Sequence, residues 1–183
     1  MDWMKDYPDA EFVIYDRSEV PMKGSIVVPN IGSDIYDKFT YIINNYDNLP
    51  DVAVYTKANL FKYISKKEFD LVKDNKTFTP LLTQNHKTHL PVAYYEDGIY
   101  YEVNNKWYLI PHPARKANEL MELLGIAEME YIPFAPGSNY ILPKENILKH
   151  SKEHYIKLRD YLKWSVYPGE AQIMERGLYT LWK

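Results

Sequence analysis

The segment from residue 24 to residue 55 constrains the fold most, because strand-like and helix-like patterns alternate within it. Ser25–Val28 is rich in β-branched residues and predicts a strand. After a polar turn, apolar and aromatic side chains recur at helical spacing, at Tyr36, Phe39, Ile42, Ile43 and Tyr46. Pro50 ends this helix, and the apolar run Val52–Tyr55 is typical of a parallel strand covered on both faces. This order of elements favours an α/β layer fold.

Further elements follow from the rest of the pattern. The run 11–15 predicts an earlier strand, and Ser33 or Asp34 is placed to cap the first helix. Tyrosine-rich runs separated by turn residues predict a small antiparallel meander, with strands at 94–95, 100–103 and 107–110. Helices are expected at 65–73, 114–124, 144–149, 152–164 and 170–182, and a last strand at 138–142.

Length and charge narrow the possible functions. The chain has 183 residues without repeats or a linker, so we expect one domain over residues 1–183. Its 22 basic and 25 acidic side chains give a net charge of −3, which does not provide the basic surface that nucleic acids require. No apolar run approaches the roughly 20 residues of a membrane helix, and the N-terminus has no signal-peptide pattern. We therefore expect a cytoplasmic protein with no nucleic-acid partner and no membrane span.

Two residue types stand out by their numbers. The absence of cysteine excludes disulfides, thiolate zinc sites and a cysteine nucleophile. The 18 tyrosines suit a cleft in which rings stack on sugars, since a ring face offers apolar contact while the hydroxyl keeps a polar partner. They suit a tyrosine-rich core equally well, and the sequence leaves both interpretations open.

Polar residues after the predicted strands are the first candidates for a site, because ligands of open α/β sheets bind beyond the carboxyl ends of the strands. An aspartate there can accept hydrogen bonds from ribose, a lysine can neutralise a diphosphate, and a loop entering a helix offers N–H groups to an anion. Together they would bind a nucleotide diphosphate. The candidates are Asp16, Arg17, Asn30, Gly32, Asp34, Lys57 and Asn59. Taken singly, each has a simpler interpretation: Asp16 forms a turn, Asp34 caps a helix and Lys57 is a solvated charge.

Glu170 is the candidate general base. It follows a Pro-Gly turn at the start of a predicted helix, where an acid can face a cleft or can simply stabilise the helix N-terminus. Glu175 lies five residues further on, which places the two side chains about 140° apart around a helix. We therefore expect the two glutamates to have different roles.

Three histidines complete the candidates. His112 lies between two prolines in an extended segment and, with Asn139 in the last predicted strand, is a candidate on the acceptor side of the site. His86 and His89 have a His-x-x-His spacing, but no third ligand lies nearby in the sequence, so the metal signal is weak.

Several blocks of the sequence are similar to a known family. The blocks are Val28–Gly32, Tyr41–Asp51, Val54–Asn59, Ala135–Glu145 and Pro168–Arg176. Together they resemble a family of small glycosyltransferase-like proteins, whose members carry an asparagine-x-glycine turn, a helix that ends in Tyr-Asp-x-Leu-Pro-Asp, and a strand that leads into a polar turn. The Tyr46–Asp51 block is the most specific of these matches.

The resemblance implies a GT-A-like fold, in which a mixed, mostly parallel sheet is covered by helices on both faces. It also implies transfer of a sugar from a nucleotide-diphosphate-sugar donor to a glycan or another hydroxyl acceptor. The chain begins after the position of the family's usual first strand, so we expect that strand to be absent. Residues 56–59 stand where many such enzymes carry Asp-x-Asp, so use of Mn²⁺ or Mg²⁺ and metal independence both stay open. The alternative is a non-catalytic glycan- or protein-binding module that uses the tyrosines from 94 to 108.

Overall fold

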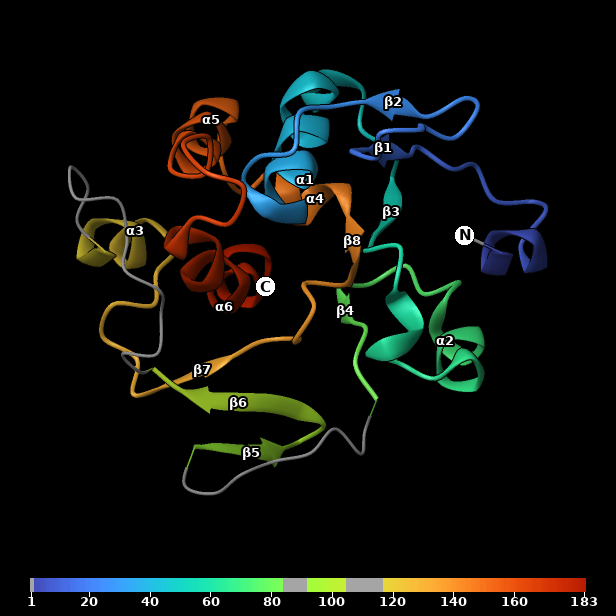
Figure 1. Ribbon diagram of the computed structural model, residues 1–183. Helices are drawn as coiled ribbons and strands as arrows, with labels where there is room; N and C mark the ends of the chain where they lie inside the picture. The colour runs from blue at the N-terminus through green and yellow to red at the C-terminus, as the bar shows by residue number, and fades with distance from the viewer. Residues whose placement is uncertain (1, 84–91, 105–116) are drawn as a thin grey trace.

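The computed structural model describes residues 2–83, 92–104 and 117–183, and there the strands form three small sheets (Figure 1). The strands are β1 (Tyr15–Asp16), β2 (Ile26–Val27), β3 (Val52–Tyr55), β4 (Thr79–Pro80), β5 (Ala93–Glu96), β6 (Ile99–Val103), β7 (Tyr131–Pro133) and β8 (Tyr140–Pro143). β1 and β2 form a parallel pair, whereas β3-β8-β4 and β5-β6-β7 are antiparallel sheets.

Helices cover these sheets from several sides. They are α1 (Ser33–Asn44), α2 (Lys66–Val72), α3 (Ala117–Leu123), α4 (Lys144–Ile147), α5 (Lys152–Asp160) and α6 (Gly169–Trp182), with three short 3-10 turns at Asp2–Asp6, Tyr46–Asn48 and Leu60–Lys62. In Figure 1 the sheet β3-β8-β4 runs through the middle, with α1, α5, α6 and α3 to its left and α2 to its right. Within the described part of the chain, no helix is long and apolar enough to cross a membrane.

The expected GT-A-like sandwich with a mostly parallel sheet is wrong. β3 pairs antiparallel with β8, and the only parallel pairing between described strands joins β1 to β2. The apolar run Val52–Tyr55 predicts a strand covered on both faces, yet Val54 is 39% exposed. The fully buried strand is β8 instead, which lies between β3 and β4. Because apolar composition does not specify strand direction, the sequence pattern could not separate the two arrangements.

The individual elements were predicted better than the sheet. The N-terminal strands shrink to two residues each, and Ile26 and Val27 in β2 are exposed, so no packing extends them. The hairpin β5-β6 confirms the start of the meander. Its expected strand at 107–110 lies outside the described residues, and β7 is the observed neighbour of β6.

The predicted helices are also found. α1, α2, α4, α5 and α6 follow the predicted segments to within a few residues, and α3 occupies the described part of its segment. Ser65 and Glu68 form a capping box at the start of α2. The expected cap of α1 by Ser33 or Asp34 is wrong, because Gly32 is the N-cap with φ 67° and no side chain accepts a capping hydrogen bond.

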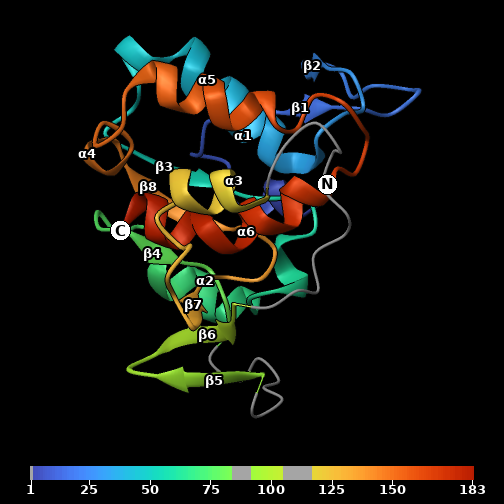
Figure 2. The ribbon, with the colours of Figure 1, turned by 90° about the vertical axis from the view of Figure 1, so that its left-hand side faces the viewer.

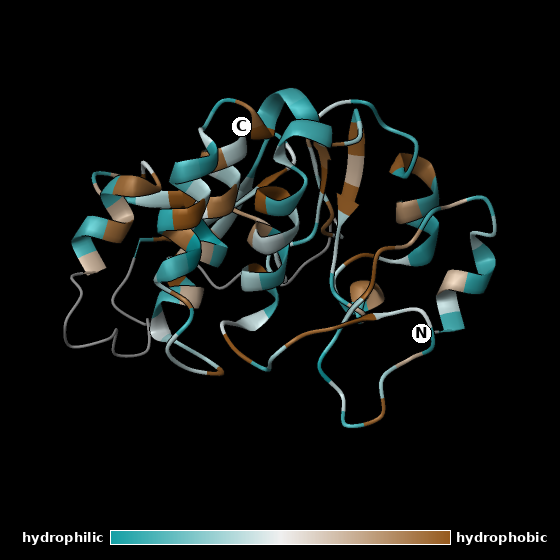
Figure 3. Ribbon diagram, turned by 90° about the horizontal axis from the view of Figure 1, so that it is seen from above, coloured by the Kyte–Doolittle hydropathy of each residue, from teal (hydrophilic) through white to brown (hydrophobic). Residues whose placement is uncertain are grey.

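The core is centred on α6. Trp182 is fully buried at the end of this helix and contacts the rings of Phe39 and Tyr140, with ring centroids 6.5 and 5.5 Å away. α1 packs along α5, and α3 packs on α6 (Figure 2). The helices carry hydrophilic and hydrophobic residues together in Figure 3, as expected for elements with one buried face.

The C-terminal end of α6 is bound by side chains from the chain around α4. Asn146 donates to the carbonyl of Trp182 at 2.7 Å, and His150 Nε2 lies 2.8 Å from the carbonyl of Leu181. A carbonyl only accepts, so Nε2 of His150 carries the proton. The ring of His154 stacks on His150 with centroids 4.7 Å apart. These contacts fix one end of the helix that reaches the candidate site.

Gly177 allows α6 to pack closely against Leu124, the residue that follows α3. A Cβ built at Gly177 would lie 2.7 Å from Leu124 Cδ1 and 2.9 Å from Leu124 Cβ, closer than carbon atoms approach in folded proteins. We expect Gly177→Ala to destabilise the protein by about 1–3 kcal/mol, although alanine alone would favour the helix by about 1 kcal/mol. Urea unfolding measures this, with Thr180→Ala on the same helix as the control. A variant as stable as the wild type would show that Leu124 can move aside without a cost in stability.

The stacked histidines should make stability depend on pH. Burial, followed by the neighbouring His150 and Lys157, lowers the pKa of His154. The unfolded chain therefore takes up a proton before the folded protein does, and stability falls as pH decreases through the ordinary histidine range. Between about pH 7.5 and about pH 5.5, we expect the urea concentration at the unfolding midpoint to decrease more in the wild type than in His154→Gln. Equal losses would contradict this origin of the pH dependence.

Candidate functional site

The turn Gly137–Asn139 holds three charged residues that come from distant parts of the chain. Its first N–H donates to Oε1 of Glu175 at 2.7 Å. The hydroxyl of its second residue donates to Oδ2 of Asp34 at 2.7 Å. The side-chain oxygen of its third residue accepts from the backbone N–H of Lys57 at 3.0 Å. One tight turn thus positions a carboxylate from α6, a carboxylate from α1 and the lysine after β3.

The backbone of this turn is unusual. Gly137 and Ser138 both have positive φ, at 92° and 57°, and for the serine this conformation is strained. A Cβ at Gly137 would lie 2.7 Å from the ring of Tyr63, so only glycine fits there. Such backbone strain persists where the surrounding contacts fix it, and it occurs most often at functional sites.

A buried lysine holds the turn by hydrogen bonds from its ammonium group. Lys38, on α1, donates to the carbonyl and the hydroxyl oxygen of Ser138 at 2.7 and 2.8 Å and forms an ion pair with Asp34. Burial lowers the pKa of Lys38, and the adjacent Asp34 opposes this effect. Burial would raise the pKa of Asp34, but Lys38 and Lys57 together hold it well below its ordinary value. Asp34 is therefore a fixed negative charge.

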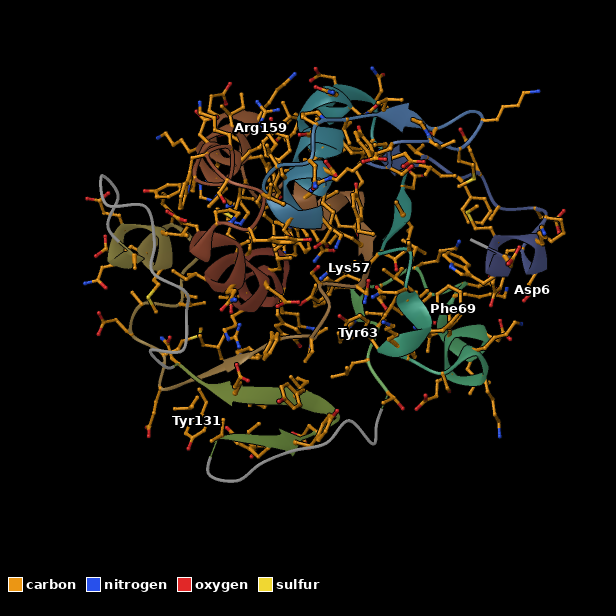
Figure 4. The ribbon with its side chains drawn as sticks, in the orientation of Figure 1. Asp6, Lys57, Tyr63, Phe69, Tyr131 and Arg159 are labelled. Atoms are coloured by element: carbon orange, nitrogen blue, oxygen red, sulfur yellow. The ribbon has the colours of Figure 1, made fainter. Side chains whose placement is uncertain are left out.

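Lys57 lies between the two carboxylates. Its Nζ is 3.2 Å from Oδ1 of Asp34 and 3.8 Å from Oε1 of Glu175. The same atom is 5.9 Å from the ring centroid of Tyr63, and Figure 4 shows the two residues near one another. Burial lowers the pKa of Lys57, but the two carboxylates outweigh it and the pKa is raised. The lysine is thus a permanent cation with two alternative partners.

These charges face a pocket of about 180 Å³ at the N-terminal ends of α1 and α6. Its lining consists of Ser33, Asp34, Ile35, Lys57, Tyr167, Pro168, Ala171, Gln172 and Glu175. The N–H groups of Gly32 and Ser33 donate to the carbonyls of Ser165 and Val166 at 2.8 and 3.1 Å, which joins the two helix starts. Helix N-termini carry partial positive charge, so the pocket combines two such ends and one lysine with two carboxylates.

Five of the predicted site residues meet at or beside this pocket. Asp34 and Lys57 line it, and Gly32 and Asn139 join it through the hydrogen bonds above. Arg17 adjoins it, because its Nη2 donates to the Ser33 carbonyl at 2.6 Å. The guanidinium also pairs with Asp37 at 2.8 Å, so Arg17 supports the start of α1.

Other predicted residues lie elsewhere. Asp16 accepts hydrogen bonds from Met22 and Ser18, which lower its pKa to about 2, and it closes the loop between β1 and β2. Asn30 and Asn59 are exposed and are not part of the pocket lining. His112, His86 and His89 lie outside the described residues.

The two glutamates of α6 differ as their spacing predicted. Glu170 is 1% exposed and accepts from Trp164 Nε1 at 3.2 Å, and it does not line the pocket. Glu175 lines the pocket and contacts Lys57. The sequence pattern singles out Glu175 only by its spacing from Glu170, and it does not indicate Lys38 or Ser138 as site residues. A lysine in an otherwise apolar helix face was the only signal that could have identified Lys38.

The described residues contain no group of three or more histidine, cysteine or acidic side chains that could hold a metal ion. Asp34 and Glu175 offer carboxylate oxygens, the ligand type that Mg²⁺ and Mn²⁺ prefer, but Lys57 lies between them.

Over residues 1–183 the chain matches a family described as "Protein of unknown function (DUF3431)". The chain belongs to this family. No curated protein and no solved structure matches it. For this DUF3431 protein, the pocket and its charges therefore carry the functional argument.

The ion pairs of Asp34 should stabilise the site strongly. In Asp34→Asn the buried ammonium of Lys38 loses its anionic partner, and we expect a loss of about 3–5 kcal/mol in the free energy of unfolding. Asp51→Asn is the matched control, because Asp51 pairs with Lys144 at 3.0 Å on the surface and such pairs contribute about 1 kcal/mol or less. Urea unfolding of both variants tests this. Equal effects would show that Lys38 does not depend on Asp34.

Proposed function

We propose that this protein is a glycosyltransferase whose pocket at α1 and α6 binds the sugar-phosphate part of a nucleotide-diphosphate-sugar donor. The observation that supports it most is the position of Lys57 between Asp34 and Glu175 at the two helix N-termini. This places a cation suited to a phosphate next to carboxylates suited to hydroxyl groups. The pocket supports this function and the sheet does not, because the arrangement of the sheet differs from the one that the resemblance implied.

The size of the pocket supports a single sugar ring. A cavity of about 150 Å³ accommodates one benzene ring, so about 180 Å³ provides room for one six-membered ring. Pockets that enclose a complete drug-sized ligand measure roughly 300–1,000 Å³. The nucleoside of the donor would therefore extend along the surface beyond the pocket.

The lining suits a polar ring. The carboxylates of Asp34 and Glu175 and the amide of Gln172 can accept hydrogen bonds from sugar hydroxyls. Tyr167 lines the pocket and is 74% exposed, so its ring face is available for stacking on the sugar. The arrangement combines directional acceptors with one aromatic face.

The phosphate side suits a leaving diphosphate. Lys57 and the N-terminal ends of α1 and α6 together attract negative charge. Transfer of a sugar needs the charge that develops on the diphosphate to be stabilised and the two substrates to be held in position. These residues supply the first requirement, and the fixed turn Gly137–Asn139 supplies rigidity for the second.

A non-catalytic glycan-binding module is the second candidate. The rings of Tyr94 and Tyr101 stack in β5 and β6 with centroids 5.0 Å apart and planes 7° from parallel, and Tyr131 of β7 packs on Tyr94 edge-on at 5.1 Å. Such a group of rings on one sheet suits stacking on sugars. It needs neither a donor nor the pocket charges, so donor binding separates the two functions.

Donor binding should depend on Lys57. We expect one of UDP, GDP, CMP and dTDP, each tested with and without Mn²⁺, to raise the melting temperature by roughly 5–10 °C at about 100 times its Kd. Lys57→Met should raise the Kd for that nucleotide about 10- to 100-fold, because a charged hydrogen bond to phosphate is lost. Lys144→Met, at the exposed ion pair with Asp51, is the control.

The same panel can overturn the proposal. A shift that Lys57→Met leaves unchanged would place the nucleotide outside this pocket. The binding module would be established instead by two results together. No nucleotide would shift the melting temperature, and an oligosaccharide would bind to the wild type but not to Tyr101→Ala. Release of nucleotide diphosphate from the selected donor in the presence of hydroxyl acceptors then measures transfer itself.

A further inference from the structure

We infer that Glu175 is the general base of the transfer and that Lys57 is its internal counter-ion, which the donor diphosphate draws away on binding. This inference rests on the proposed function, since it assigns the acceptor side of the same pocket. It replaces the candidate Glu170, which lies buried against Trp164 and outside the pocket lining.

The two oxygens of Glu175 have different surroundings. Oε1 accepts from the Gly137 N–H at 2.7 Å and lies 3.8 Å from Lys57 Nζ. Oε2 makes no hydrogen bond to any residue that the structure describes, while the side chain lines the pocket and is 24% exposed. One oxygen thus fixes the orientation of the carboxylate and the other is available to a hydroxyl group in the pocket.

The other carboxylate of the pocket does not suit this role. Asp34 interacts with Lys38, Lys57 and the Ser138 hydroxyl at once, and its two oxygens are both engaged. A carboxylate held so firmly in its ionised form is a poor proton acceptor. Asp34 is therefore suited to position Lys57 and a sugar hydroxyl, and Glu175 to accept a proton.

Lys57 connects the two ends of the reaction. A diphosphate in the pocket would compete with both carboxylates for the ammonium, and phosphate oxygens are strong acceptors for it. When Nζ moves toward the phosphate, the carboxylate of Glu175 is released from its contact with Lys57 and faces the acceptor hydroxyl without a competing cation. Donor binding would thus prepare the base before the acceptor reacts.

The chemical step balances without a further reactant. The acceptor hydroxyl transfers its proton to Oε2 of Glu175 while its oxygen forms a bond to the anomeric carbon of the sugar. The bond between that carbon and the diphosphate oxygen breaks, and its electron pair leaves with the nucleotide diphosphate, whose charge Lys57 neutralises. A single displacement of this kind inverts the configuration at the anomeric carbon.

The experiment assays four variants at three glutamates with the donor that the nucleotide panel selects. In Glu175→Gln, whose amide oxygen can still accept from Gly137 and from a sugar hydroxyl, we expect kcat to fall about 10²- to 10⁴-fold. The donor should bind no more weakly than to the wild type, because one competitor of the diphosphate for Lys57 loses its charge. Formate should restore part of the activity of Glu175→Ala, because it supplies a carboxylate in the space left. Glu170→Gln should retain turnover, and Glu145→Gln, on the exposed side of α4, is the control for a charge change.

The outcomes separate the two proposals. If the wild type binds no nucleotide sugar, the proposed function fails and this inference falls with it. If the wild type binds and turns over the donor while Glu175→Gln keeps its kcat, or while formate does not rescue Glu175→Ala, the assignment of Glu175 is wrong and the proposed function stands. Retention of anomeric configuration in the product would likewise overturn the single displacement.

Discussion

The charge of Lys38, buried on α1, is the constraint on which the candidate site depends. Removing an ammonium group from water is costly unless acceptors surround it. Here the acceptors are Asp34 and two oxygens of Ser138, so satisfying the lysine fixes the middle of the turn Gly137–Asn139. The same turn then fixes Glu175 and the backbone of Lys57. A requirement of the core thus sets the geometry of the pocket.

The charges that face the pocket balance one another although each side chain is partly exposed. Lys57 has two carboxylate neighbours at 3.2 and 3.8 Å, while Asp34 already has the second lysine behind it. Without Lys57, Asp34 would still pair with the ammonium of Lys38, whereas Glu175 would keep, among the described residues, only the hydrogen bond from the Gly137 N–H. The two carboxylates are similarly exposed, at 22% and 24%, and they differ because the buried Lys38 forms an ion pair with Asp34 and not with Glu175.

The sequence predicted local elements well because their determinants are local. The periodic side chains of α1 and the Ser65–Glu68 box of α2 lie within one or two turns of the helix that they specify. The direction of β3 depends instead on β8, more than 80 residues away in the register Tyr55↔Tyr140, and nothing within Val52–Tyr55 encodes it. The same holds for the site: Lys38 and Ser138 are 100 residues apart and meet only in the folded chain.

The expectation that ligands bind beyond the carboxyl ends of strands identified Asp34 and Lys57, although the parallel sheet on which it was based is not present among the described strands. Lys57 follows β3, and Asp34 lies in the first turn of the helix that precedes β3, so one helix–strand unit brings them together whatever lies beside β3. Asp16 requires more, namely that β1 share a sheet with β3, and it does not. The pocket is therefore a property of the α1–β3 unit closed by the turn Gly137–Asn139 and α6.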